Sequence, residues 1–157
     1  MWGRTATSAA SKAISEVEVY LVDTDVVSEI RKGGKANSGV RGFFATASKE
    51  GIPLYLSVVT IGELRTGVER LRHRGDTPQA KRLERWLRQI TTTYADAILP
   101  IDIDIAHVWG RLRVPNHENP LDKQIAATAL IHDLAVVTRN TAHFAPTGVR
   151  IHNPFEA

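Results

Sequence analysis

The chain has 157 residues, of which 43% are hydrophobic and 24% are charged, with a formal net charge of +3 and a pI near 9.4. This length fits a single domain with a sizeable buried core, and the absence of cysteine excludes disulfides and thiolate metal sites. No apolar run approaches the roughly 18 residues of a membrane-spanning helix. We therefore expect a cytoplasmic protein, and the mild positive charge favours an acidic partner such as nucleic acid.

Residues 1–18 differ in composition from the rest of the chain. They are mostly small and polar, and they lack the apolar segment of a secretory signal. We expect residues 1–18 to form a mobile extension, with at most a frayed helix over residues 11–17. Residues 19–157 are then expected to form one domain.

A short apolar run, Val19 to Val22, predicts a buried strand that stops at Asp23. We expect Asp25 to cap a helix from Val26 to Arg31. Ligands of open parallel sheets bind beyond the carboxyl ends of the strands, so Asp23 is a candidate site residue. On this strand alone, the alternative that both aspartates only cap and turn the chain is equally supported.

The next segment predicts a helix over residues 40–49 and a second strand over residues 54–59. Thr60 then opens a helix, and Thr60 and Glu63 have the spacing of a capping box, in which each side chain bonds the other's free backbone N–H. The same geometry places Glu63 in the first turn after a strand. Glu63 is therefore either a capping residue or a site residue.

Residues 65–88 predict a basic helical hairpin, with Thr77 as the N-cap of the second helix and Pro78 at its first position. Eight basic residues stand against three acidic ones, which gives this segment a charge of +5. Such a hairpin could follow a phosphate backbone, or it could be a solvated face of an amphipathic pair. The basic residues are Arg65, Arg70, Arg72, Arg74, Lys81, Arg82, Arg85 and Arg88.

The remaining chain predicts a strand over 97–101, a helix opened by Asp102 or Asp104 and ending at 113, and a helix over 121–133. Asp122 heads the buried stripe of that last helix, where a carboxylate needs compensation by an N-cap role or by a metal ion. A continuous apolar strand over 134–137 then ends in Thr138-Arg139-Asn140. We expect Phe144 to fill the core and residues 149–151 to form an edge strand.

Alternating strands and helices predict an α/β fold with a mostly parallel sheet of four to five strands flanked by helices. The carboxyl ends of parallel strands share one edge, so Asp23, Glu63 and Asn140 are expected there, with Asp122 placed less securely. Three crowded carboxylates repel one another unless cations are present. Oxygen ligands suit Mg²⁺ or Mn²⁺, which activate water and neutralise charge on a phosphodiester.

Four motifs, taken together in order and spacing, carry a resemblance to a known family. The chain resembles PIN-domain ribonucleases and, more narrowly, the VapC toxins of bacterial type II toxin–antitoxin systems, from about residue 20 to residue 155. The motifs are Val22-Asp23-Thr24-Asp25-Val26-Val27-Ser28-Glu29, Thr60-Ile61-Gly62-Glu63-Leu64, Leu121-Asp122 with Ile125-Ala126-Ala127-Thr128-Ala129, and Val137-Thr138-Arg139-Asn140.

This resemblance implies a PIN-like three-layer fold and a metal-dependent endoribonuclease. Its catalytic residues correspond to Asp23, Glu63, Asp122 and Asn140, the last at a position where many relatives carry a fourth acid. Asp23, Glu63 and Asp122 are the implied ligands of Mg²⁺ or Mn²⁺. The implied partners are RNA, a small antitoxin protein and a second copy of the chain. We expect Arg65, Arg70, Arg74 and Arg139 to contact RNA.

Two residues depart from the family pattern. Asp25 stands where relatives often have Asn, and His143 stands where an Asp often precedes the Phe. Asn140 and His143 together remove negative charge from one flank of the site. The occupancy of a second metal position is therefore open.

Two other functions are compatible with parts of the sequence. Asp23 to Val27 also resembles the nucleophile motif of haloacid-dehalogenase phosphatases, but that family needs a Lys and an acidic pair after Thr138, where only Glu156 is found. A non-catalytic RNA- or protein-binding module is the other alternative. The retention of three acids argues against it.

Overall fold

The computed structural model describes residues 18–156. The mobile extension expected for residues 1–18, with its helix over 11–17, therefore lies outside the described residues except for Glu18. The Glu18 carboxylate forms a salt bridge with Arg150, whose Nε lies 3.2 Å from Oε1.

The centre of the fold is a parallel sheet of five strands in the order β3-β2-β1-β4-β5. In the register of this sheet, Val22 of β1 lies opposite Val137 of β4, which lies opposite His152 of β5. The α/β prediction is thus confirmed, and each described strand pair is parallel. The strands are β1 (Tyr20–Val22), β2 (Leu54–Ser57), β3 (Ile98–Leu99), β4 (Ala135–Val137) and β5 (Ile151–His152).

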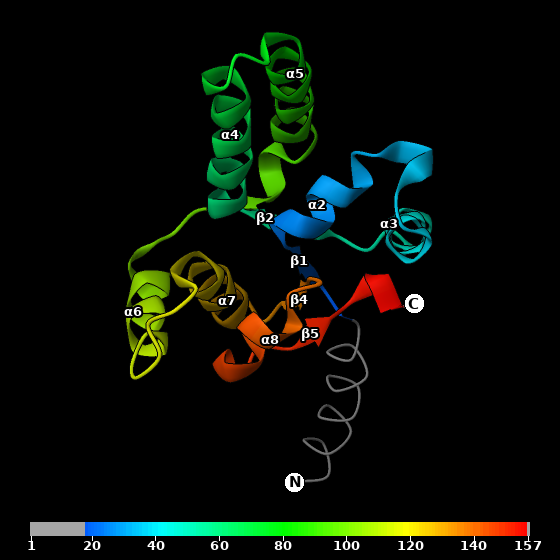
Figure 1. Ribbon diagram of the computed structural model, residues 1–157. Coiled ribbons are helices and arrows are strands. Elements are labelled where there is room, and N and C mark those ends of the chain that lie inside the picture. Colours follow the sequence, from blue (N-terminus) through cyan, green and yellow to red (C-terminus); the bar gives the residue numbers. More distant parts are fainter. Residues whose placement is uncertain (1–17, 157) are drawn as a thin grey trace, which may run out of the picture.

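Seven α-helices in the described part of the chain cover the sheet and connect its strands (Figure 1). Figure 1 shows α2 and α3 on one side of the sheet, α7 and α8 on the other, and the α4–α5 hairpin projecting from the end of β2. The helices are α2 (Thr24–Ile30), α3 (Ser38–Glu50), α4 (Val58–His73), α5 (Thr77–Thr93), α6 (Ile103–Leu112), α7 (Pro120–His132) and α8 (Thr141–Phe144).

Successive strand residues point to opposite faces, and each face has its own core. Val22 and Val137 pack with helices α2 to α5, in a cluster that includes Val26 and Leu64. Leu21 and its neighbours pack with α7 and α8 in a second cluster. Phe144 belongs to that second cluster and is fully buried, so the core position predicted for it is confirmed. The result is the three-layer arrangement expected from the sequence.

The boundary between β2 and α4 was predicted wrongly. Residues 54–59 were expected to be strand, but β2 ends at Ser57 and α4 begins at Val58. Ser57 caps α4, because its hydroxyl accepts a hydrogen bond from the Val59 N–H at 3.0 Å. Thr60 is therefore inside the helix, and the capping box with Glu63 does not exist.

Three other caps differ from the predictions. Asp23, rather than Asp25, is the N-cap of α2. Asp76, rather than Thr77, caps α5, because its longer-reaching carboxylate accepts from Gln79 N–H at 3.2 Å. Asp122 lies in the first turn of α7 and is not its N-cap, since the helix begins at Pro120. The expected strands over 97–101, 134–137 and 149–151 are shorter or shifted, as the bounds of β3, β4 and β5 show.

None of the helices in residues 18–156 combines the length and the apolar character that crossing a lipid bilayer requires.

Candidate active site

Asp23 lies directly after β1, at the carboxyl edge of the sheet, and its side chain is only 2% exposed. Its Oδ1 accepts a hydrogen bond from the Thr24 N–H at 2.8 Å, and its Oδ2 accepts one from the Thr138 hydroxyl at 2.8 Å. The Asp23 N–H continues the sheet by donating to the Val137 carbonyl at 2.9 Å. The carboxylate is therefore fixed by the residue that follows it at the start of α2 and by the residue that follows the neighbouring strand β4.

Asp25 comes from the first turn of α2, and among the neighbouring charges it raises the pKa of Asp23 most. Its Oδ2 accepts a hydrogen bond from the Arg139 N–H at 2.9 Å and lies 3.5 Å from the Thr138 hydroxyl oxygen. The other oxygen, Oδ1, is buried and has no hydrogen-bond partner among residues 18–156. A buried carboxylate oxygen without a partner costs free energy unless a proton or a cation compensates it.

The electrostatics of this pair follow from its burial. Burial is the main reason why the pKa of Asp23 is raised from 3.8 to about 7, and the negative charges of Asp25 and Asp122 raise it further. Burial likewise raises the pKa of Asp25, to which the charge of Asp122 adds. Hydrogen bonds from Thr138 and from backbone N–H groups act in the opposite direction. Three aspartates thus repel one another at this edge.

Glu63 is held by a threonine from another helix. The Thr24 hydroxyl donates to Glu63 Oε1 at 2.6 Å, a short distance typical of a bond to a charged oxygen. The Thr24 and Thr60 hydroxyl oxygens lie 3.0 Å apart. Glu63 therefore lies at the same edge as Asp23, because Thr24 directly follows Asp23 in the chain.

Asp122 enters from the opposite layer, in the first turn of α7. Its Oδ2 lies 2.7 Å from Nδ1 of His143, which belongs to α8. Asn140 precedes α8 and is exposed, and its backbone N–H donates to the Thr138 hydroxyl at 2.9 Å. Asp122 and Asn140 are thus connected to the site through α8 and the loop that precedes it.

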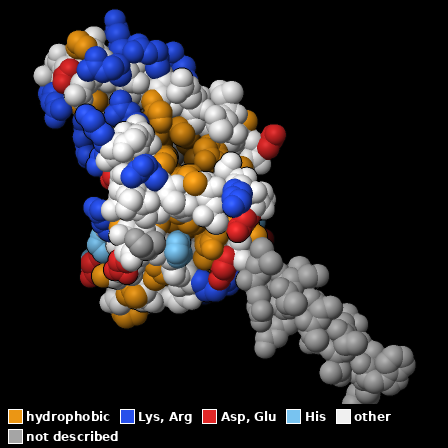
Figure 2. Space-filling view, turned by 90° about the vertical axis from the view of Figure 1, so that its right-hand side faces the viewer, with side chains coloured by type: hydrophobic (Ala, Val, Ile, Leu, Met, Phe, Trp, Pro, Cys, Tyr) orange, Lys and Arg blue, Asp and Glu red, His pale blue; other side chains and the backbone are white. Residues whose placement is uncertain are grey.

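The basic residues of the α4–α5 hairpin fall into two groups. Arg65 and Arg72 form salt bridges with Glu84 across the hairpin, at 2.6 and 3.1 Å. Within residues 18–156, Arg70 and Arg74 make no salt bridge. Figure 2 shows blue Lys and Arg side chains gathered at the top of the molecule, over this hairpin.

The guanidinium of Arg139 lies 3.7 Å from the centre of the Phe155 ring, in a cation–π contact. Its backbone N–H is the donor to Asp25. The loop between β4 and α8 is therefore held on one side by Asp25 and on the other by Phe155.

Comparisons with known proteins agree with this arrangement. The family model described as the PIN domain matches residues 20–148. The chain belongs to the PIN-domain family. It is 33% identical to Toxin FitB of Neisseria gonorrhoeae, over 87% of this chain and 99% of that protein. It is 30% identical to a VapC ribonuclease of Sinorhizobium fredii, over 88% of this chain and 99% of that one.

A solved structure resembles this PIN domain closely. The crystal structure of FitAcB from Neisseria gonorrhoeae superposes with a TM-score of 0.76 and 32% identity, covering 88% of this chain and 100% of that chain. The relatives therefore agree with the resemblance to VapC-type toxins found in the sequence.

The donor atoms of this PIN domain fit a hard divalent cation. The edge offers carboxylate oxygens, one of them buried without a partner, and mutually repelling aspartates that a cation would relieve. Within the described residues, however, no three His, Asp or Glu side chains form a ready set of ligands. Coordination by Asp23 and its neighbours thus requires carboxylate side chains to rotate toward a shared ion.

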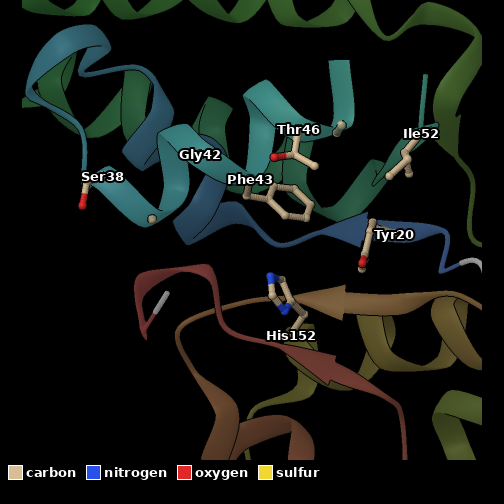
Figure 3. A pocket seen from close by; sticks show the side chains of 9 residues that line it. Tyr20, Ser38, Gly42, Phe43, Thr46, Ile52 and His152 are labelled. Carbon is tan, nitrogen blue, oxygen red and sulfur yellow. The ribbon is translucent and has the colours of Figure 1, made fainter. Parts of the chain in front are cut away.

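A pocket of about 480 Å³ opens elsewhere in this PIN domain, on the α3 side of the sheet. Figure 3 shows Tyr20 and Phe43 lining it, with His152 below them. The side chains of Tyr20 and Phe43 make an edge-to-face contact with ring centres 5.1 Å apart. None of the predicted site residues lines this pocket, so it is separate from the acidic edge.

The sequence pointed to four site residues but did not include three that the structure places beside them. Asp25, Thr138 and His143 all contact a predicted site residue or the loop that carries one. Asp25 and Thr138 had a sequence signal, because both lie within three residues of a strand end. His143 had none beyond its departure from the family pattern.

Proposed function

We propose that this chain is the endoribonuclease toxin of a toxin–antitoxin pair and that it hydrolyses RNA phosphodiesters with Mg²⁺ or Mn²⁺. The observation that carries the proposal is the buried Asp23 carboxylate, surrounded by repelling acids at the functional edge of a PIN domain. Support also comes from relatives that are named as a toxin and as a ribonuclease.

In this proposal Asp23 and Asp122 hold the divalent cation, and Glu63 completes the carboxylate set from α4. The bound ion supplies the means to activate water and to neutralise charge on the phosphodiester. The chain's own contribution is orientation. Thr138 and the Thr24 N–H fix Asp23, and the Thr24 hydroxyl fixes Glu63.

His143 holds one oxygen of Asp122, which leaves the other oxygen for the ion. Asn140 offers a neutral amide at the start of α8, where it can bind a phosphate oxygen or the attacking water without adding repulsion. Arg70 and Arg74, which make no salt bridge within residues 18–156, can neutralise RNA phosphates, whereas Arg65 is already engaged by Glu84. Arg139 is exposed and lies next to Asn140, so it adds a positive charge beside this loop.

The proposed partners are RNA, a cognate antitoxin and a second copy of the chain. The antitoxin is supported by the similarity to Toxin FitB and to a solved structure, 26% identical, that is described as a member of the VapBC family of toxin–antitoxin systems. An antitoxin that inhibits this chain must cover the acidic edge or prevent RNA from reaching it. The apolar side chains of Val58 and Leu121, 43% and 46% exposed, lie next to the functional elements and offer contacts for such a protein.

The proposal is tested by expression in a bacterial host. Induction of the wild-type chain should stop growth and fragment cellular RNA, whereas Asp122→Asn, expressed at the same level, should do neither. Co-expression of the cognate antitoxin should restore growth. Growth arrest by Asp122→Asn equal to that by the wild type would contradict the proposed catalytic role of this edge.

A further inference from the structure

Two helices of this protein begin with the same arrangement of acids. In α2 the N-cap is Asp23 and Asp25 is the second helical residue, and in α6 the N-cap is Asp102 and Asp104 is the second helical residue. Asp104 is exposed, as expected for an acid that only complements a helix dipole. Asp25 is largely buried, and one of its oxygens has no hydrogen-bond partner in the described part of the chain, which a helix dipole alone does not explain.

The Asp25 carboxylate lies beside that of Asp23, and both are close to the Thr138 hydroxyl. The Thr138 hydroxyl donates to Asp23 Oδ2 at 2.8 Å and lies 3.5 Å from Asp25 Oδ2. A hydroxyl has one hydrogen to donate, so it serves Asp23 and leaves Asp25 with the Arg139 N–H as its donor. Two carboxylates therefore meet at one hydroxyl, and the unsatisfied oxygen belongs to Asp25.

The bond to Arg139 also places Asp25 against the loop that carries Asn140. This loop follows β4 and ends at the functional edge, where Asn140 contributes an amide without charge. The carboxylate of Asp25 thus brings a negative charge from α2 to the side of the site where the Asn140 loop brings no negative charge.

We propose that Asp25 is a direct ligand of the divalent cation, binding it through Oδ1 alongside Asp23. This inference rests on the proposed metal-dependent function and adds a ligand to it. A cation would satisfy the orphaned oxygen and relieve the repulsion between the two carboxylates. Arg139 N–H then acts as the group that orients the Asp25 carboxylate toward the ion.

The test is the affinity of the purified full-length chain for Mn²⁺, measured without RNA from the electron paramagnetic resonance signal of free Mn²⁺. Asp25→Asn keeps an oxygen that can accept from Arg139 N–H but loses the charge. We expect it to weaken Mn²⁺ binding by about tenfold or more, on the scale at which metal-site substitutions act. The matched control, Asp104→Asn, removes an acid from the same helical position and should leave the affinity unchanged.

A second variant separates charge from scaffold. In the double variant Asp25→Asn with Asn140→Asp, the negative charge moves to the adjacent loop, so Mn²⁺ affinity should largely recover. If the Mn²⁺ affinity of the double variant does not recover, the negative charge of Asp25 is not what binds the ion, and the proposal is overturned. If circular dichroism shows that Asp25→Asn is unfolded, Asp25→Ser provides the same comparison with a smaller acceptor.

The outcomes distinguish this inference from the function on which it rests. If Asp25→Asn and the wild type bind Mn²⁺ equally well and the wild type cleaves RNA, only the role of Asp25 as a ligand is overturned. Asp25 then serves only as the acceptor of the hydrogen bond from the Arg139 N–H. A wild-type chain that binds no Mn²⁺ would overturn the metal site and the role of Asp25 together.

Discussion

Replacing Asp23 by Asn should abolish activity and yet stabilise the fold. The pKa of Asp23 is raised from 3.8 to about 7 in the folded chain. At 1.36 kcal/mol per pKa unit, this shift means that the ionised carboxylate destabilises the folded state by roughly 4 kcal/mol. An Asn side chain has no charge to bury, and its amide can donate to the Thr138 hydroxyl, which rotates to accept.

The pH dependence of stability gives this prediction its sign. Because the pKa of Asp23 is higher in the folded chain, the unfolded chain loses its proton first as the pH rises. The wild type therefore loses stability between about pH 4 and pH 7, and more than half of the roughly 4 kcal/mol is lost between pH 5 and pH 8. Asp23→Asn has no carboxyl group at this position and therefore does not show this loss of stability with rising pH.

The assay is urea unfolding, followed by circular dichroism in EDTA at pH 5 and pH 8. After allowance for a weakened hydrogen bond, Asp23→Asn should be more stable than the wild type by roughly 2 to 4 kcal/mol at pH 8, and by less than about 2 kcal/mol at pH 5. Asp104→Asn, the exposed counterpart, should change stability by less than about 0.5 kcal/mol. A variant that is less stable than the wild type at pH 8, or a difference that does not vary with pH, would refute the reasoning.

Three further predictions address the other parts of the site. Thr24→Val removes the hydroxyl that holds Glu63 and should slow RNA cleavage without unfolding the chain. The exposed Thr66→Val should change neither the cleavage rate nor the folding of the chain. Arg70→Ala with Arg74→Ala should weaken RNA binding and reduce the slope of log affinity against log salt by about 1.4 for single-stranded RNA; unchanged slopes would show that these arginines are only a solvated face. Mn²⁺ at about 100 times its dissociation constant should stabilise the wild type by about 2.7 kcal/mol in thermal melts, and a melting curve that does not change with Mn²⁺ would contradict the proposed cation site.

The layered fold was predictable because its signals are local. The strands β1 to β4 are short, mostly apolar runs, and each is followed by an α-helix. Such alternation leads to a parallel sheet with helices on both sides. Asp23 was predictable for the same reason, since it stands where β1 stops. The matching positions of Asp122 and Asn140 required the family motifs, because a single acid at the start of a helix has several common explanations.

The contacts that organise the site were not predictable from local patterns. The bond from Thr24 to Glu63 joins residues 39 apart in the chain, and the bond from Thr138 to Asp23 joins residues 115 apart. The error at the start of α4 had a similar cause. Val58 and Val59 have β-branched side chains that favour a strand, but the Ser57 cap and the packing of α4 on the sheet make them helical.

The central claim is that the acidic edge cleaves RNA with a divalent cation, and the most direct measurement is RNA cleavage by the purified chain. The wild type should cleave RNA in Mg²⁺ or Mn²⁺, lose that activity in EDTA, and regain it when the ion is restored. Asp122→Asn, with an unchanged circular dichroism spectrum, should be slower than the wild type by about two orders of magnitude or more whenever the ion is present. Cleavage that persists in EDTA, or that is equally fast in Asp122→Asn, would contradict the account.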